Sequence, residues 1–213
     1  MLPLAPHIHL AALGDDVVLL DVLTDAYLCI PGGVAHLRPD SGGAHVDPPD
    51  DDIRRMLAEA GYLTEGDAGP ARARPDPPRR SLEARADARP ARGEALRLAA
   101  ATLDLLTCYR GRSLAQILAV AARRQPSTSD PLEAVRLAQV FQHFAPWLPL
   151  SRKCLVRSFV LLRFLQRSGV AAQWVFGVRT WPFSAHCWIQ HGDLVLDDHW
   201  ERLVVYEPIL RVG

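Results

Sequence analysis

Short apolar runs separated by turn-forming residues occupy the beginning of the chain. The runs at residues 7–13 (HIHLAAL) and 17–30 (VVLLDVLTDAYLCI) are interrupted by Gly14-Asp15-Asp16 and by Thr24-Asp25. Because glycine and aspartate favour tight turns between extended segments, this pattern predicts a small three-stranded meander.

A helical period follows at residues 50–63 (DDDIRRMLAEAGYL), directly after Pro48-Pro49. The aspartates of its first turn suit the positive end of the helix dipole, and Ile53, Leu57 and Ala60 share one face. Gly61 predicts the end of this helix. Strands and helix together indicate a small α+β unit over residues 1–66.

Residues 67–92 are rich in Pro, Ala, Arg and Asp and contain no aromatic residue. Such a segment buries too little apolar surface to offset the entropy lost on ordering. We interpret it as a solvated linker, with a helix beginning near Ser81; the alternative is contact of its arginines with an acidic partner.

From Gly93 the apolar positions recur with a helical period. Residues 94–110 place Leu96, Leu103 and Leu106, with Ala99 and Ala100, at helical spacing. Further helices are predicted at 113–124, 130–148 and 151–169, and strands at 171–180, 185–198 and 201–207, with a hairpin turn at 191–193. Helices followed by an antiparallel sheet give an α+β domain over residues 93–213.

The overall charge hides an uneven distribution. The chain has 213 residues, 49% apolar, with 24 basic and 24 acidic side chains. Residues 1–66 carry 3 basic and 11 acidic side chains, a net of −8, whereas 67–92 carry +3 and 93–213 carry +5. The zero sum argues against nucleic acid or an anionic membrane as the main partner, and the asymmetry suggests modules with separate partners.

The cysteines and the apolar runs indicate the compartment. Cys29, Cys108, Cys154 and Cys187 have no metal-type spacing, so we expect reduced thiols, and we expect neither a metal nor a cofactor. The N-terminus lacks the pattern of a signal peptide, and no run is long and apolar enough to span a membrane. A cytoplasmic protein without a membrane partner is the expectation.

Cys154 is the candidate nucleophile. With Ser151 as the N-cap, its sulfur lies in the first turn of the predicted helix, where free backbone N–H groups favour an anion. Arg152, Lys153 and Arg157 add positive charge nearby, which lowers a thiol pKa. The alternative is a small apolar residue buried in a helix interface.

His186 and one of two aspartates, Asp197 or Asp198, complete a candidate triad. His186 lies on a predicted strand and Asp197 and Asp198 at the end of the next one, so that an aspartate can face the histidine across a hairpin. The imidazole then accepts the thiol proton and the carboxylate orients the ring. Zinc bound by Cys154, His186, Cys187 and His199 is disfavoured, because adjacent strand residues point to opposite faces. Trp188, on the same face as His186, either shields the site from water or packs.

The stretches RKCLVRSFVLLRFLQRSGV, HCWIQHGDLVLDD and VVYEPILR resemble the B proteins of lasso-peptide biosynthesis, which are leader peptidases of transglutaminase-like, papain-superfamily fold. The resemblance covers about residues 95–213 and implies that Cys154 is the nucleophile, His186 the general base and Asp198 the orienting acid. Cys187 stands where the family usually has a small apolar residue, and Gln190 where a Glu is common; both put substrate fit in doubt.

The first 66 residues resemble the PqqD-like leader-recognition domain of such systems, a small winged-helix unit in whose groove the leader adds as an extra strand. The resemblance rests on strand order, size and the final helix. It implies a leader-binding groove formed by Ala26, Tyr27, Leu28, Cys29, Ile30, Ile53, Met56 and Leu57. Core packing of a small domain is the alternative for about half of these residues.

These features together predict a cysteine endopeptidase that removes the leader from a ribosomally synthesised lasso precursor. The resemblance implies two partners, the precursor peptide and an asparagine-synthetase-like macrocyclase that closes the ring. The alternatives are a transglutaminase-like acyl transferase or amidase with the same triad, and a non-catalytic peptide-binding scaffold.

Overall fold

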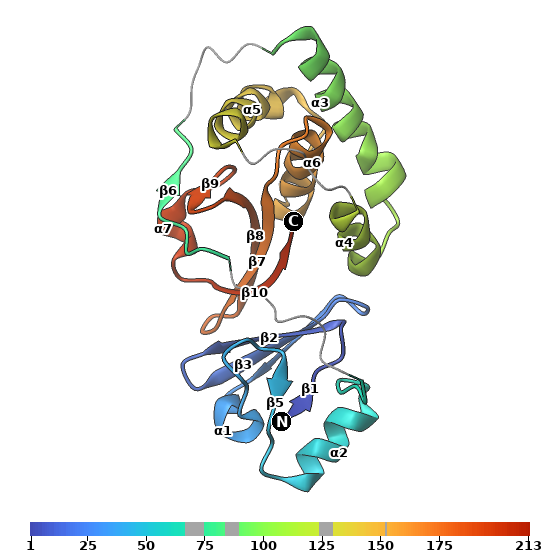
Figure 1. Cartoon of the computed structure of the whole chain (residues 1–213), viewed down its shortest axis with the longest axis vertical. Coiled ribbons are helices and arrows are strands. Elements are labelled where there is room, and N and C mark those ends of the chain that lie inside the picture. The colour runs from blue at the N-terminus through green and yellow to red at the C-terminus, as the bar shows by residue number, and fades with distance from the viewer. Residues whose placement is uncertain (67–74, 84–89, 124–129, 152) are drawn as a thin grey trace.

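The computed structural model describes residues 1–66, 75–83, 90–123, 130–151 and 153–213 (Figure 1). Its N-terminal elements are β1 (Leu2–Pro3), β2 (Ile8–Leu13), β3 (Asp16–Asp21), β4 (Ala26–Ile30), α1 (Gly33–Leu37), β5 (His45–Val46) and α2 (Asp51–Glu59). The later elements are β6 (Arg80–Ser81), α3 (Arg92–Asp104), the π-helical turn η1 (Leu105–Tyr109), α4 (Leu114–Ala122), α5 (Pro131–Phe144), the 3₁₀ turn η2 (Ala145–Trp147), α6 (Cys154–Arg167), β7 (Gln173–Arg179), β8 (Ser184–His191), β9 (Leu194–Val195), α7 (Trp200–Leu203) and β10 (Glu207–Val212).

The N-terminal meander forms as predicted. Strands β2, β3 and β4 pair antiparallel in that order, so β3 is central and β4 lies at the edge of the sheet. Both turns contain a left-handed residue, Gly14 with φ 61° and Asp25 with φ 56°. Glycine adopts this conformation without strain, and aspartate tolerates it in tight turns.

Helix α2 also forms where the pattern predicts it. The side chain of Asp50 caps it by accepting a hydrogen bond from the N–H of Asp52 at 2.8 Å, and Gly61 follows its end with φ +71°. Leu57 is buried in a cluster with Ile8, Val17 and other apolar residues of the N-terminal unit. One face of the meander is therefore covered by this small core.

The other face of the meander packs on the C-terminal half. Val18 and Leu20 of β3 belong to the same hydrophobic cluster as residues of α4, α5 and α6. At the border, the indole N–H of Trp181 donates to Asp16 at 2.7 Å, and the N–H of Ala115 donates to the carbonyl of Val22 at 3.2 Å. The two halves share a continuous apolar core and do not interact through a tether alone.

The predicted linker contains a strand where a helix start is expected. Residues 80–81 form β6, which pairs parallel with β9, and Leu82 is buried. Arg80 fixes this strand through an ion pair with Asp193 at 2.6 Å. The helix start near Ser81 is therefore wrong, because the free edge of β9 offers hydrogen bonds to an extended backbone. Residues 67–74 and 84–89 of the expected linker lie outside the described residues.

The C-terminal half is built around α6 and a five-stranded sheet in the order β10-β7-β8-β9-β6. Helix α6 lies against this sheet, with α3, α4 and α5 around it (Figure 1). Most of its residues are buried, and these include polar ones, Ser158, Arg163 and Gln166, alongside the apolar side chains. A mixed helix and sheet architecture is thus confirmed.

Two local predictions fail in this half. The leucines at helical spacing do not form a buried face: the buried residues of α3 are Glu94, Leu98, Ala101 and Asp104, whereas Leu96 and Leu103, and Leu106 in η1, are exposed. The reason is electrostatic: Asp104 faces inward to pair with two arginines of α6, Arg163 at 2.9 Å and Arg167 at 2.7 Å.

The second failure concerns residues 201–207, which are predicted as one strand. They contain most of the short helix α7, and the strand β10 begins only at Glu207.

No helix among the described residues is long and apolar enough to cross a membrane.

Candidate active site

Cys154 is the first residue of α6. The helix begins two residues later than the expected cap at Ser151 requires: the N-cap residue is Lys153, which makes no side-chain capping bond. Cys154 is half-buried at the N-terminal end of α6. The backbone N–H groups of the first turn of α6 have no partner within the helix. Such a position favours a negative charge on sulfur.

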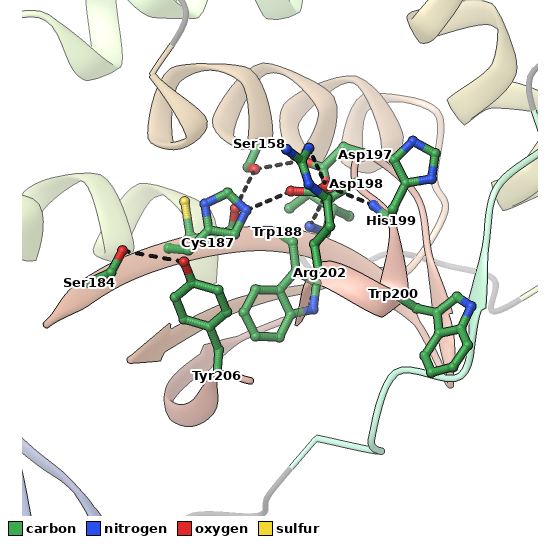
Figure 2. Close-up of polar contacts among 12 residues, drawn as sticks. Ser158, Ser184, Cys187, Trp188, Asp197, Asp198, His199, Trp200, Arg202 and Tyr206 are labelled. Atoms are coloured by element: carbon green, nitrogen blue, oxygen red, sulfur yellow. Dashed lines mark hydrogen bonds and ion pairs between the residues drawn. The ribbon is translucent and has the colours of Figure 1, made fainter. Parts of the chain in front are cut away.

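His186 and Asp198 meet across the hairpin of β8 and β9. Gly192, with φ +58°, turns the chain between these strands, so that the residues after β9 return alongside β8. Nε2 of His186 lies 2.7 Å from Oδ2 of Asp198 (Figure 2). Oδ1 of the same carboxylate accepts the backbone N–H of His199 at 2.7 Å, which fixes its orientation.

The pKa values of Cys154 and His186 move in opposite directions. Hydrogen bonding from the Cys187 thiol and from the His186 imidazole lowers the pKa of Cys154 to about 4, against the effect of burial. Hydrogen bonding to Asp198 and then to Cys154 raises the pKa of His186 to about 10. Since Nε2 is taken by Asp198, Nδ1 is the nitrogen that remains for the sulfur. These opposite shifts favour a thiolate–imidazolium pair over a neutral thiol beside a neutral imidazole.

Cys187 takes the role that the sequence assigns to neighbouring basic residues. Arg157 lies with its guanidinium over the ring of Phe141, 5.5 Å from the centroid, and Arg152 is outside the described residues. Cys187 is buried, and its own pKa is raised well above normal, first by its hydrogen bond to Cys154. A neutral thiol therefore donates to a neighbouring thiolate. In the sequence, the only sign of this role is that a cysteine, Cys187, follows His186 where the family usually has a small apolar residue.

His186 and Cys187 do point to opposite sides of β8, as expected for adjacent strand residues. Cys187 belongs to the cluster beneath α6, whereas the His186 ring stacks on Trp188 at 6.3 Å and lies 5.6 Å from the ring of Tyr206. Cys154 lies where it hydrogen-bonds with both neighbours.

A glycine makes room for the aromatic rings that hold the imidazole. Gly177 of β7 is directly opposite His186 in the strand register. A Cβ at this position would come within 2.8 Å of the Trp188 ring and 3.0 Å of Tyr206. Close packing of both rings beside the histidine thus depends on the absence of a side chain at 177, which sequence reasoning missed.

Asp197, the neighbour of Asp198, holds the loop after β9 in place. Its carboxylate accepts the Ser158 hydroxyl at 2.6 Å and the N–H of Ile189 at 2.8 Å, which joins α6, β8 and the loop after β9 (Figure 2). Burial raises the pKa of Asp197 to about 6. The sequence places Asp197 and Asp198 side by side, and the structure separates their roles: one carboxylate faces the imidazole and the other anchors the loop.

The cavity at the candidate site receives residues from the N-terminal unit. A cavity of about 140 Å³ is lined by the candidate residues Cys154 and His186 and also by Asp25, just before β4, and Tyr27 of β4. The Tyr27 ring packs on Phe183 at 5.7 Å, and burial raises the pKa of its hydroxyl to about 12. The candidate site is therefore shared by both halves of the chain, which sequence patterns do not reveal.

The predicted leader-binding residues divide into three groups. Ala26, Leu28 and Met56 are exposed. Tyr27 and Cys29 contact the cluster shared with the C-terminal half. Leu57 is buried and Ile30 and Ile53 pack against the N-terminal core, so these three fill the core.

His199 does not belong to the cluster around the sulfur. It is exposed at the start of α7, and its ring points away from the imidazole–carboxylate pair (Figure 2). Among the described residues no group of three or more His, Cys, Asp or Glu side chains is arranged to hold a metal ion.

Comparison with known proteins identifies the family of the C-terminal half. The family model of the transglutaminase-like superfamily matches residues 99–211, more than half of the chain. The chain belongs to the transglutaminase-like superfamily. That superfamily generally includes enzymes resembling cysteine proteases.

One curated relative is the microcin J25-processing protein McjB of Escherichia coli, which is 42% identical over 45 residues. The matched segment spans 21% of this chain and 22% of that relative, so only about a fifth of each is covered. No solved structure matches the chain.

The role of Cys187 gives a testable prediction. In Cys187→Ala the pKa of Cys154 rises because the strongest hydrogen bond to its thiolate is lost. The rate of alkylation of Cys154 by iodoacetamide at mildly acidic pH should fall at least about tenfold. Cys187→Ser keeps a donor and should retain most of the rate. Equal rates in wild type and Cys187→Ala would show that Cys187 has no such role.

Proposed function

We propose that this protein is a cysteine endopeptidase that removes the leader from a lasso precursor peptide. The observation that carries the proposal is the arrangement of Cys154, His186 and Asp198, with the imidazole 2.7 Å from the carboxylate and hydrogen-bonded to the sulfur. The similarity to a microcin-processing protein, though confined to a short segment, supports a peptide precursor as substrate.

The reaction begins with attack of the Cys154 thiolate on the scissile carbonyl. The backbone N–H of Cys154, at the first position of α6, is suited to stabilise the oxyanion. When the tetrahedral intermediate collapses, the C–N bond breaks and the His186 imidazolium gives its proton to the leaving amine. The leader then remains on sulfur as a thioester, and the core peptide leaves with a free amino terminus.

Hydrolysis of the thioester restores the enzyme. The neutral imidazole takes a proton from water, the resulting hydroxide attacks the thioester carbonyl, and the thiolate leaves. Asp198 stabilises the imidazolium in both steps and holds the ring with Nδ1 toward the sulfur. A leader with a free carboxylate is the second product.

The N-terminal unit is proposed to be a PqqD-like domain of winged-helix type that captures the leader. Strand β4 is an edge strand of the meander, and a peptide adds to such an edge through backbone hydrogen bonds. The beginning of β4, at Asp25 and Tyr27, lines the catalytic cavity. A leader paired antiparallel to β4 therefore leaves the strand with its C-terminal end at the cavity, which is the end that carries the scissile bond.

The proposed partners follow from this reaction. The freed amine of the core peptide is the group that a macrocycle-forming enzyme consumes, and an asparagine-synthetase-like cyclase is the proposed acceptor. We place the protein in the cytoplasm, where the precursor is made. We propose a division into a recognition domain (1–66), a linker (67–92) and a protease domain (93–213). The recognition and protease domains pack on each other through the shared apolar core.

The protease activity is tested with the purified protein and the precursor encoded beside its gene. Cys154→Ala should reduce the cleavage rate by on the order of 10⁴-fold, because the nucleophile is lost. Cys108→Ala, which replaces a half-buried cysteine outside the triad, should cleave at the wild-type rate. Chromatography with mass spectrometry measures the products.

The product masses separate the proposal from its alternatives. A leader that has gained the elements of water indicates hydrolysis, whereas a leader joined to another amine indicates an acyl transferase. Cleavage that persists unchanged in Cys154→Ala, or a wild-type protein that binds the precursor and never cleaves it, contradicts the proposal.

Leader capture is tested by measuring the affinity of a fluorescent leader peptide for the Cys154→Ala protein, which lacks the proposed nucleophile. Leu28→Asp and Met56→Asp should each weaken binding about tenfold, because both side chains are exposed on the proposed groove, 47% and 65% respectively. Leu132→Asp, at an exposed position on α5, is the matched control and should bind normally. Point variants are preferable to deletion of residues 1–66, since deletion opens the shared core.

The acidic character of residues 1–66 adds a second readout to the same assay. If the net −8 attracts basic residues of the leader, added salt weakens binding. Affinity that does not change with salt means that the acidic residues serve solubility alone. For the groove itself, wild-type affinity for the leader in both Leu28→Asp and Met56→Asp would contradict leader capture at β4.

A further inference from the structure

A second, larger cavity adjoins the catalytic one. It has a volume of about 580 Å³ and lies between η1 and the beginning of α6. The two cavities share three lining residues, Asp25, Leu114 and Leu155. Leu155 directly follows the nucleophile, so the larger cavity opens beside the sulfur.

One wall of this cavity is formed by leucines at the end of α3 and in η1, while Asp25, Arg110 and Arg112 add charged groups to the lining. Leu103 and Leu106 line the cavity, yet they are 59% and 62% exposed. The chain turns there from an α-helix into the π-helical turn η1, while Asp104 faces inward to Arg163 and Arg167. The ion pairs thus hold the helix in an orientation that presents leucines outward. Exposed apolar residues in a concave surface indicate a binding site.

The position of Asp25 indicates which part of a peptide enters the cavity. Asp25 precedes β4 and lines both cavities. A leader running antiparallel to β4 passes Asp25 before its scissile bond reaches Cys154. The residues that precede the scissile bond therefore cross the mouth of the larger cavity.

We propose that this cavity is a substrate subsite that binds a large apolar side chain in the last residues of the leader. The inference rests on the proposed function, because it takes a peptide acylated on Cys154 as the occupant. The leucines of the wall supply affinity by removing the side chain from water, and the shared residues place that side chain beside the reacting carbonyl.

Peptidyl chloromethyl ketones test the subsite without the natural precursor. The thiolate displaces chloride from such a reagent, so a C–S bond forms, a C–Cl bond breaks, and the peptide occupies the leader side of the site. Two tripeptidyl reagents are compared, each ending in alanine and preceded by either two leucines or two serines. In the wild type the leucine reagent should alkylate Cys154 about tenfold faster or more.

Variants of the cavity wall make the test specific. Leu106→Asp and Leu103→Asp should abolish the preference for the leucine reagent, while the rate with iodoacetamide, which has no side chain to bind, stays unchanged. Leu96→Asp is the matched control, since Leu96 is an exposed leucine of α3 outside the cavity wall, and it should keep the preference. An unchanged iodoacetamide rate also shows that the variant is folded at the site.

Each outcome decides the proposal. Equal rates with the two reagents in the wild type, or a preference that survives in both wall variants, would overturn the subsite. Failure of the proposed function is distinct: a precursor that is never cleaved, with the leucine preference present and sensitive to Leu106→Asp, leaves the subsite standing for another peptide substrate.

Discussion

The contact between the first residue of α6 and the middle of β8 is the constraint on which the site depends. It brings a half-buried sulfur against an imidazole and a second thiol, and burial by itself would keep that sulfur protonated. The hydrogen bonds of His186 and Cys187 reverse this effect. These bonds form only if the N-terminus of α6 lies at one position on the sheet. The ionisation of Cys154 therefore depends on how the helix packs.

The surrounding structure holds that contact from several directions. Asp198 takes one nitrogen of the imidazole, and Asp197 ties the same loop to Ser158 of α6 and to the backbone of β8. Gly177 leaves space for the rings of Trp188 and Tyr206 beside the histidine. The N-terminal meander closes the arrangement, since its sheet shares the core and its turn at Asp25 lines the cavity.

The sequence predicted the parts of this structure that follow from local pattern. The meander, the capped helix α2 and the helix α6 come from periodicity and turn residues, whereas the choice of Asp198 as the partner of His186 came from the family resemblance. The failures have a common cause, which is that a distant partner overrides the local pattern. Asp104 turns α3 because two arginines of α6 attract it, and residues 80–81 extend because β9 offers them an edge. Cys187 acts on Cys154 of α6, and Gly177 leaves space for Trp188 and Tyr206, so both roles depend on contacts between distant parts of the chain. For Cys187 the sequence shows only that an unusual residue follows the histidine.

The central claim, that Cys154 exists as a thiolate paired with the His186 imidazolium, is tested most directly by the ultraviolet absorbance of the thiolate as a function of pH. The difference between wild type and Cys154→Ala isolates the one sulfur. Its folded-state pKa is depressed, so the thiolate signal should persist at neutral pH and disappear only as the pH falls through about 4. A transition near the ordinary thiol pKa of ~8.5 would contradict the account.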